Sequence, residues 1–201
     1  MKTKLGIIAF IVTGMVVLGG TWACASNDVE TIKRLAKERE AAAKMLAQES
    51  EAACVTTASV KATPQMIIDK VNKACALIEK EGKASFSKFQ GKDSEFIFAG
   101  TYIWINSFSG IMEMHPIKYG LNGKQVIRFR DALGKKYFVE FIETCKNKGE
   151  GWVEYMWPKP GQKAASHKVS YVKKAILDGK EVVVGCGVYG MSMEEIKNAM
   201  K

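Results

Sequence analysis

The spacing of hydrophobic residues changes along the chain and divides it into regions. Residues 5–18 (LGIIAFIVTGMVVL) form an uncharged apolar run. Residues 29–46 then carry apolar side chains at intervals of three and four, which is typical of an amphipathic helix, and residues 66–78 repeat this spacing. After residue 95, apolar and polar residues alternate, and alternation predicts β-strands. The pattern therefore predicts an apolar N-terminal segment, two helices and a domain that contains a sheet.

Two long helices are predicted before the sheet. Asn27 or Asp28 can cap the first, which we expect to run to about Glu51, and the small residues of 52–62 are expected to form a connector. Thr63 followed by Pro64 is a typical helix start, and Gly82 is expected to end the second helix. The first helix has a narrow, alanine-rich apolar stripe. We expect it to pack against another helix, including that of a second copy, or on its own domain.

Five strands are predicted from the alternating segments. FIFAGTYIWIN (96–106) and IMEMH (111–115) are expected to pair around a turn at 107–110, and a long, glycine-punctuated connection follows. The other strands are predicted at 151–157, 166–175 and 181–190, with turn-forming residues between them. A short helix at 134–149 and a C-terminal helix complete the order. The expected fold class is α+β, a five-stranded antiparallel sheet with helices packed on one side of it.

Residues 1–25 have the features of a secretory signal peptide. Lys2 and Lys4 precede the apolar run, and residues 23–25 (ACA) have the small-x-small pattern at which such peptides are cleaved. Cleavage before Ser26 is the favoured interpretation. An uncleaved membrane anchor ranks second, and lipid attachment at Cys24 ranks third. We therefore expect the rest of the chain to be periplasmic or otherwise extracytoplasmic, and membrane-anchored if the segment is not cleaved.

The chain is basic, with a net charge of +9 over 201 residues. Residues 1–25 contain two Lys and no acid, so 28 basic and 21 acidic residues remain beyond them, a net charge of +7. Only four of the basic residues are Arg, and the Lys are scattered. Because base readout and phosphate clamping rely on Arg, nucleic acid is not expected as a partner. An anionic ligand remains compatible with this charge.

Metal and nucleotide chemistry are poorly supported. Cys54, Cys75, Cys145 and Cys186 follow the N-terminal segment without a Cys-x-x-Cys pair, and they suit either two disulfides or buried free thiols. Two His are too few for a three-His zinc site. GCGVYG (185–190) matches G-x-G-x-x-G, but the chain continues for only 11 residues, too few for the βαβ unit of a dinucleotide fold. Glycines inside a strand instead indicate that another group comes close, and no cofactor is expected.

Aromatic residues with polar tips fall on the predicted strands. Tyr102 and Trp104 share one strand face, Tyr155 and Trp157 share another, and Tyr171 shares a face with Lys173. Apolar walls with a few directed donors suit a small amphipathic anion. The alternative is an ordinary core of a sheet packed on helices, and spacing alone favours this alternative slightly.

Four strings resemble type 2 single Cache domains, a family of extracytoplasmic PAS-like sensory domains. They are TYIWINSFSGIMEMHP (101–116), GKKYFVEFIETCKNKGEGWVEYMWPKPG (134–161), KVSYVKKA (168–175) and VVVGCGVYG (182–190), and the match covers roughly residues 64–190. The resemblance implies a PAS-like sheet, a small carboxylate as ligand, a membrane receptor or kinase as partner, and a homodimer formed through the first helix. Ser107-Phe108-Ser109 and Gln125 replace an Asp and an Asn that are common in the family, which leaves the identity of the ligand open.

We expect a ligand site between the strands, and with it a domain organisation. The expected organisation is a signal peptide (1–25), a long helix with its connector (26–62) and a Cache-like ligand-binding domain (63–201). Tyr171 and Lys173 are the expected carboxylate donors, and His115 is expected at the rim, held by Pro116. The expected ligand-binding residues are Tyr102, Trp104, His115, Pro116, Tyr155, Trp157, Tyr171 and Lys173. No catalytic residue is expected. The alternatives are an interaction protein with a filled cavity and, less favoured, an enzyme with His115 as general base.

Overall fold

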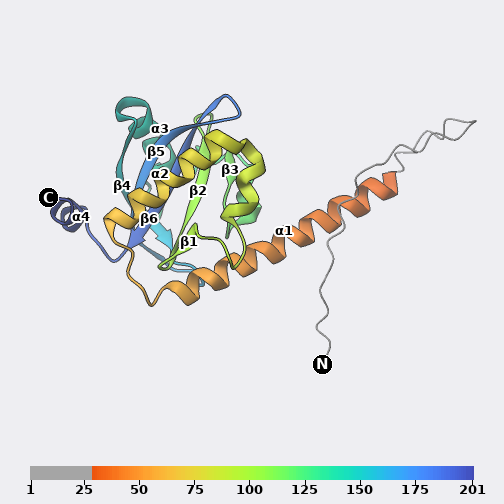
Figure 1. The fold of residues 1–201 in the computed structure, drawn as a ribbon, viewed down its shortest axis with the longest axis horizontal. Coiled ribbons are helices and arrows are strands. Elements are labelled where there is room, and N and C mark those ends of the chain that lie inside the picture. The colour runs from red at the N-terminus through yellow and green to blue at the C-terminus, as the bar shows by residue number, and fades with distance from the viewer. Residues whose placement is uncertain (1–28) are drawn as a thin grey trace, which may run out of the picture.

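A computed structural model of the protein describes residues 29–201. An antiparallel sheet lies at the centre of the domain, helices cover both of its faces, and one long helix extends away from it (Figure 1). The helices of the described residues are α1 (Val29–Thr57), α2 (Pro64–Glu81), α3 (Tyr137–Lys148) and α4 (Met193–Ala199), with short 3-10 helices η1 (Gly82–Phe89) and η2 (Tyr119–Leu121).

The sheet has the strand order β1-β2-β6-β5-β4, and β3 pairs with β2 beside this path. All of the pairings are antiparallel. The strands are β1 (Ile97–Phe98), β2 (Thr101–Ser107), β3 (Met112–Met114), β4 (Glu150–Pro158), β5 (Ala165–Leu177) and β6 (Lys180–Tyr189). The α+β class with an antiparallel, PAS-like sheet is confirmed.

The first predicted strand is divided into β1 and β2, so the described sheet has six strands rather than five. Ala99 and Gly100 both have positive φ, at 46° and 73°, and reverse the chain between the two strands. A side chain at position 100 would lie within about 3 Å of Ala58, and the Gly100 N–H donates to the Thr57 hydroxyl. This tight turn therefore rests directly on the end of α1.

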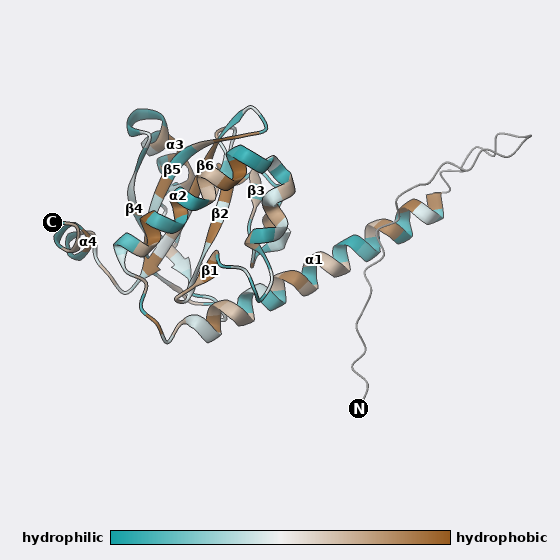
Figure 2. Ribbon diagram, viewed as in Figure 1, coloured by the Kyte–Doolittle hydropathy of each residue, from teal (hydrophilic) through white to brown (hydrophobic). Residues whose placement is uncertain are grey.

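The helix α1 is longer than predicted and only partly packed. It continues past Glu51 to Thr57, because Ala47, Ser50 and Cys54 are buried against the domain. Apolar residues near its start, Val29 and Ile32 among them, are exposed, and Figure 2 shows brown and teal alternating along the part that leaves the domain. The predicted cap at Asn27 or Asp28 and the predicted signal peptide lie outside the described residues.

The helices α2 and α3 pack on opposite faces of the sheet, which corrects the expectation that helices lie on one side. The Thr63 side chain caps α2 and Gly82 ends it, as predicted. Buried Ile67, Val71 and Ile78 of α2 belong to one core cluster. The buried face of α3 belongs to a second cluster. The aromatic residues of this cluster can fill a core or line a cavity. Successive residues of a strand point to opposite faces, so each central strand contributes to both clusters.

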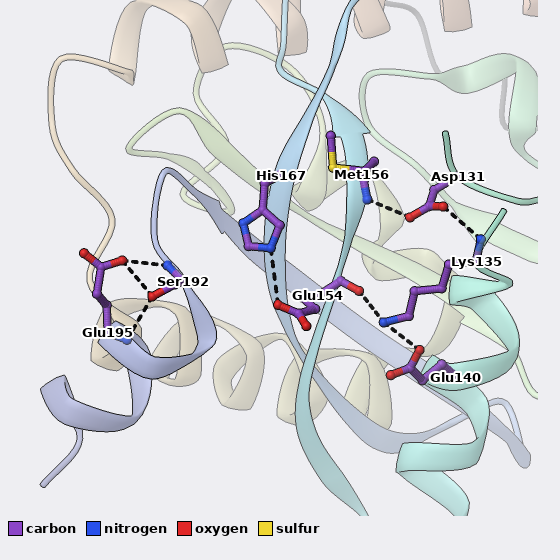
Figure 3. A network of polar contacts seen from close by, with 8 residues as sticks. All are labelled: Asp131, Lys135, Glu140, Glu154, Met156, His167, Ser192 and Glu195. Carbon is purple, nitrogen blue, oxygen red and sulfur yellow. Dashed lines mark hydrogen bonds and ion pairs between the residues drawn. The ribbon is translucent and has the colours of Figure 1, made fainter. Parts of the chain in front are cut away.

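The connection 117–136 is fastened to the outer edge of β4 (Figure 3). One Asp131 carboxylate oxygen accepts the Met156 N–H at 2.9 Å, and the other accepts the Lys135 N–H at 2.9 Å. The Lys135 ammonium donates to the Glu154 carbonyl oxygen and pairs with Glu140 at 2.9 Å. Partial burial works to raise the pKa of Asp131, but the backbone N–H donors outweigh it and lower that pKa. Asp131 thus pins this connection beside α3.

The four described cysteines are buried free thiols, one of the two arrangements that the sequence left open. Burial raises the pKa of Cys54 to about 12 and that of Cys186 to about 11. Such thiols behave as small apolar core residues. Within residues 29–201, none of the helices has the length and apolar character needed to cross a membrane.

Candidate ligand site

An aromatic cavity lies between the α3 face of the sheet and α3 itself. It has room for about one water molecule, roughly 10 Å³. Strands β2, β3 and β4, the segment that follows β3, and α3 all contribute to it. The lining residues are Tyr102, Trp104, Met112, His115, Tyr137, Phe138, Phe141, Tyr155 and Trp157.

Ring contacts and one hydrogen bond hold the cavity walls together. Tyr137 stacks on Tyr155 with ring centroids 4.9 Å apart, and Tyr102 lies 5.0 Å from His115. The Trp157 indole N–H donates to the Tyr102 hydroxyl at 2.9 Å. Aromatic pairs at such separations add to the stability that burial itself gives. The walls are therefore held in contact with one another around the small space that they enclose.

His115 is a neutral hydrogen-bond donor in this cavity. Its Nδ1 accepts the backbone N–H groups of Ile117 and Lys118, at 3.3 and 3.0 Å, so in the neutral ring the proton resides on Nε2. Burial, with Lys168 and Lys118 nearby, lowers the pKa of His115 well below its usual value. A ring in this tautomer has no lone pair free to act as a general base. This geometry argues against the enzyme alternative.

Lys168 is a buried cation next to the cavity. Its side chain is 0 % exposed, and its ammonium lies 4.6, 5.3 and 4.8 Å from the ring centroids of Tyr102, Trp104 and Tyr189. No hydrogen-bond partner is present for Nζ among the described residues. Burial lowers the pKa of Lys168 to about 8, so the group is still mostly protonated at neutral pH. The aromatic faces stabilise this charge only partly.

Two glycines of the GCGVYG segment make room for these side chains. A Cβ at Gly185 would collide with the Trp104 ring, and a Cβ at Gly187 would collide with the Ser170 hydroxyl and lie 2.6 Å from Lys168 Cε. The sequence predicted that some group comes close to these glycines. The close groups are the side chains of the neighbouring strands β2 and β5.

The site offers hydrogen-bond donors without matching acceptors. Among the described residues, the buried Trp104 indole nitrogen has no hydrogen-bond partner, like the Lys168 ammonium. Within residues 29–201, no carboxylate lines the cavity. Buried polar groups are nearly always paired, so each unpaired donor calls for an explanation. A small ligand with acceptor atoms and a negative charge would pair them.

The structure brings together five of the eight residues predicted for this site. Tyr102, Trp104, His115, Tyr155 and Trp157 all line the cavity, with His115 as part of its wall rather than at its rim. Their role in binding remains a prediction. Pro116 is buried next to His115 in the chain but does not line the cavity.

The two predicted carboxylate donors lie on the other face of the sheet. Tyr171 belongs to the α2 core cluster, and Lys173 forms an ion pair with Glu150 at 2.8 Å. Lys168 pairs with Tyr155 across β4 and β5, and Lys173 lies five positions further along β5, so the two Lys point to opposite faces. The sequence signal for Lys168 was its position opposite an aromatic strand, but finding it requires the strand register.

Comparisons with known proteins give this site a family context. A family model described as a Cache domain matches residues 28–200. The methyl-accepting chemotaxis protein McpP of Pseudomonas putida KT2440 is 33% identical over 88 residues, which are 44% of this chain and 16% of that protein. The aligned part thus spans a small share of the receptor's length.

Solved structures of sensor domains are also similar. A periplasmic sensor domain of a chemotaxis protein is 28% identical, with a TM-score of 0.45 and coverage of 81% of this chain and 99% of that one. A Cache chemosensory domain described in terms of carboxylic acid recognition is 23% identical, with a TM-score of 0.45 and the same coverage of 81% and 99%. Because the family model matches almost all of the residues that the structure describes, the chain belongs to the Cache domain family.

Proposed function

We propose that this protein binds a small carboxylate in the aromatic cavity and acts as a sensory module. In this proposal the ligand's carboxylate pairs with Lys168, and Tyr102, Trp104, His115, Tyr155 and Trp157 surround it. The observation that carries the proposal is the Lys168 ammonium, which is buried next to the cavity and has no acceptor among the described residues.

Charge and hydrogen bonding favour an anion over a neutral ligand. Burying an unpaired charge is costly, and a carboxylate that pairs with it recovers part of that cost. A hydrogen bond to a charged group contributes about 1.5–3 kcal/mol. The Nε2–H of His115 and the indole N–H of Trp104 are further donors for the second carboxylate oxygen. This set of donors matches one carboxylate group with a short apolar tail against the rings.

Space limits the ligand to a short carboxylate and requires some movement of the walls. The cavity holds about one water, roughly 10 Å³, so acetate needs side-chain repacking. Met112 is a flexible side chain in the lining, and Trp157 is only half-buried and lies at the outer side, where Lys118 sits 5.1 Å from its ring centroid. We infer that the ligand enters past Trp157.

The sensory role rests on the family and on the similarity to a chemotaxis receptor. We propose that the domain works outside the cytoplasm, that residues 1–25 direct its export, and that residues 63–201 form the ligand-binding unit. Signalling would pass to a membrane receptor or kinase. The exposed apolar residues of α1, such as Val29, Ile32 and Leu35, suit a homodimer formed along this helix.

A thermal-shift titration with acetate, propionate and pyruvate tests the proposal, with acetamide as a neutral control of nearly the same shape as acetate. A midpoint that rises with acetate concentration but not with acetamide supports a carboxylate site, because a ligand that binds only the native state stabilises it. No response to any of the three acids at millimolar concentrations would refute it.

The small size of the cavity favours one alternative, an interaction protein whose cavity is filled by its own aromatic side chains. It predicts flat titrations with every small acid, together with a stable dimer. The titrations separate the two, because both allow a dimer and only the sensory proposal requires a response to ligand.

A further inference from the structure

A second depression lies away from the aromatic cavity, on the side of the domain where α1 ends. It has a volume of about 450 Å³, within the range of small-molecule sites. The end of α1 with its connector, the β1–β2 turn, the β4–β5 turn and the end of β6 form its walls. We call this depression the basal groove. It shares no lining residue with the aromatic cavity.

The basal groove has an apolar surface that remains in contact with solvent. Val55 and Val60 line it and are 51% and 57% exposed. Ala58, Val188 and Met191 line it as well. Single exposed apolar residues are ordinary on a protein surface, but several gathered in one concave site favour binding of an apolar group.

The charge around the basal groove is positive. Lys61 and Lys159 line it, and none of the other described lining residues carries a carboxylate. Lys159 has no carboxylate partner among the described residues, and its ammonium lies 6.0 Å from the ring centroid of Tyr189. The ammonium of Lys168 lies 4.8 Å from the same ring. Lys168 is fully buried and does not line the groove, so Lys159 is the cation on the groove side of this ring.

Two carboxylates beside the groove are already engaged. Glu51 accepts the Gly161 N–H at 3.0 Å, and Glu195 forms the capping box of α4 with Ser192, as Figure 3 shows. Glu195 also interacts electrostatically with Lys61. Lys159 is therefore the cation best placed to receive an anionic group from solution, with Lys61 as a weaker second.

We propose that the basal groove is a second binding site, for an amphipathic anion that has one acidic head group and an apolar tail. The tail lies on Val55, Val60 and Val188, and the head group pairs with Lys159 and Lys61. The aromatic cavity is too small for such a molecule, so the two sites select different ligands from one another.

Decanoate, kept below the concentration at which it forms micelles, is the probe, and isothermal titration calorimetry is the measurement. We expect saturable binding of one decanoate per chain. The double variant Lys61→Gln, Lys159→Gln should bind it about tenfold more weakly, since two ion pairs with the head group at the protein surface are lost. Val60→Glu, at an exposed position, should weaken binding similarly by repelling the head group.

Two controls distinguish binding in the basal groove from binding in the aromatic cavity. Lys124→Gln with Lys180→Gln removes the same charge from exposed positions outside the groove and should leave decanoate binding unchanged. Lys168→Met should also leave decanoate binding within about threefold, whatever its effect on acetate. Absence of decanoate binding, equal binding by the groove double variant, or loss of binding in Lys168→Met would each overturn the proposal.

Discussion

Replacing Lys168 by Met should weaken ligand binding and stabilise the free protein at the same time. Met has a similar length and no charge, so it removes the ammonium while it keeps contact with the Tyr102 and Trp104 rings. The buried ammonium destabilises the free protein because burying a charge is costly, and the same ammonium holds the ligand. Removing it therefore raises stability and lowers affinity.

The size of acetate limits its affinity for the wild type, and the loss of one hydrogen bond sets the change in the variant. Acetate has few atoms, and the ceiling of about 1.5 kcal/mol per non-hydrogen atom limits its binding to about 6 kcal/mol, a Kd of roughly 40 μM. Losing one charge-assisted hydrogen bond costs about 1.5–3 kcal/mol. Lys168→Met should therefore bind acetate about 10- to 150-fold more weakly.

The gain in stability follows from the pKa of Lys168. Burial lowers it from 10.5 to about 8, and at about 1.4 kcal/mol per pKa unit this corresponds to roughly 3 kcal/mol of destabilisation at neutral pH. The lost cation–π contacts offset about 1–2 kcal/mol of that gain. Without ligand, the variant should be more stable by about 1–2 kcal/mol.

Urea denaturation with and without acetate, together with calorimetric titration, measures both effects. Lys173→Met is the matched control, since Lys173 lies on the same strand but pairs with Glu150 on the other face. The control should leave acetate affinity unchanged. Unchanged acetate affinity in Lys168→Met, or a variant less stable than the wild type by more than about 1 kcal/mol, would refute the reasoning.

Three further predictions concern pH, backbone space and the fastened connection. The pKa of Lys168 in the folded protein lies below its value in the unfolded chain, so stability should rise with pH between about 8 and 10.5. Acetate affinity should fall about tenfold per pH unit above pH 8, because the ammonium loses its proton. Urea melts and acetate titrations across this pH range check both. Gly187→Ala should cost about 1–3 kcal/mol and weaken acetate binding, and Gly120→Ala, with open space around it, should do neither. Asp131→Ala should cost about 1–2 kcal/mol in urea melts, and because the pKa of Asp131 is lowered, this difference from wild type should shrink as pH falls below about 4, as measured by melts at pH 3.

Local signals in the sequence predicted much of the fold. The start of α2 at Thr63-Pro64 and its end at Gly82 are each encoded by the residues at that end of the helix. Predicting them requires no knowledge of the rest of the chain. The end of α1 is different. Val55, Thr56 and Thr57 disfavour a helix locally, but burial of Cys54 against the domain extends it through them.

The face of β5 could not be read from its own residues. The prediction places Tyr171 and Lys173 on the cavity side of β5, but Tyr171 packs in the core cluster under α2. Lys168 is not among the predicted site residues, and it is buried. The pairing register between β4 and β5 decides the matter, and a long connecting turn leaves that register open in the sequence.

Because α1 is packed on the domain only at its C-terminal end, a small rotation there moves the other end of the helix by a larger distance. Only its C-terminal part touches the domain, near Cys54 and the β1–β2 turn, and Figure 1 shows the remainder projecting outward. At 1.5 Å per residue, the arm from Ala47 to Val29 is about 27 Å long. A tilt of about 5° at its base would move the far end by roughly 2 Å, so a change too small to alter the sheet is amplified along the arm.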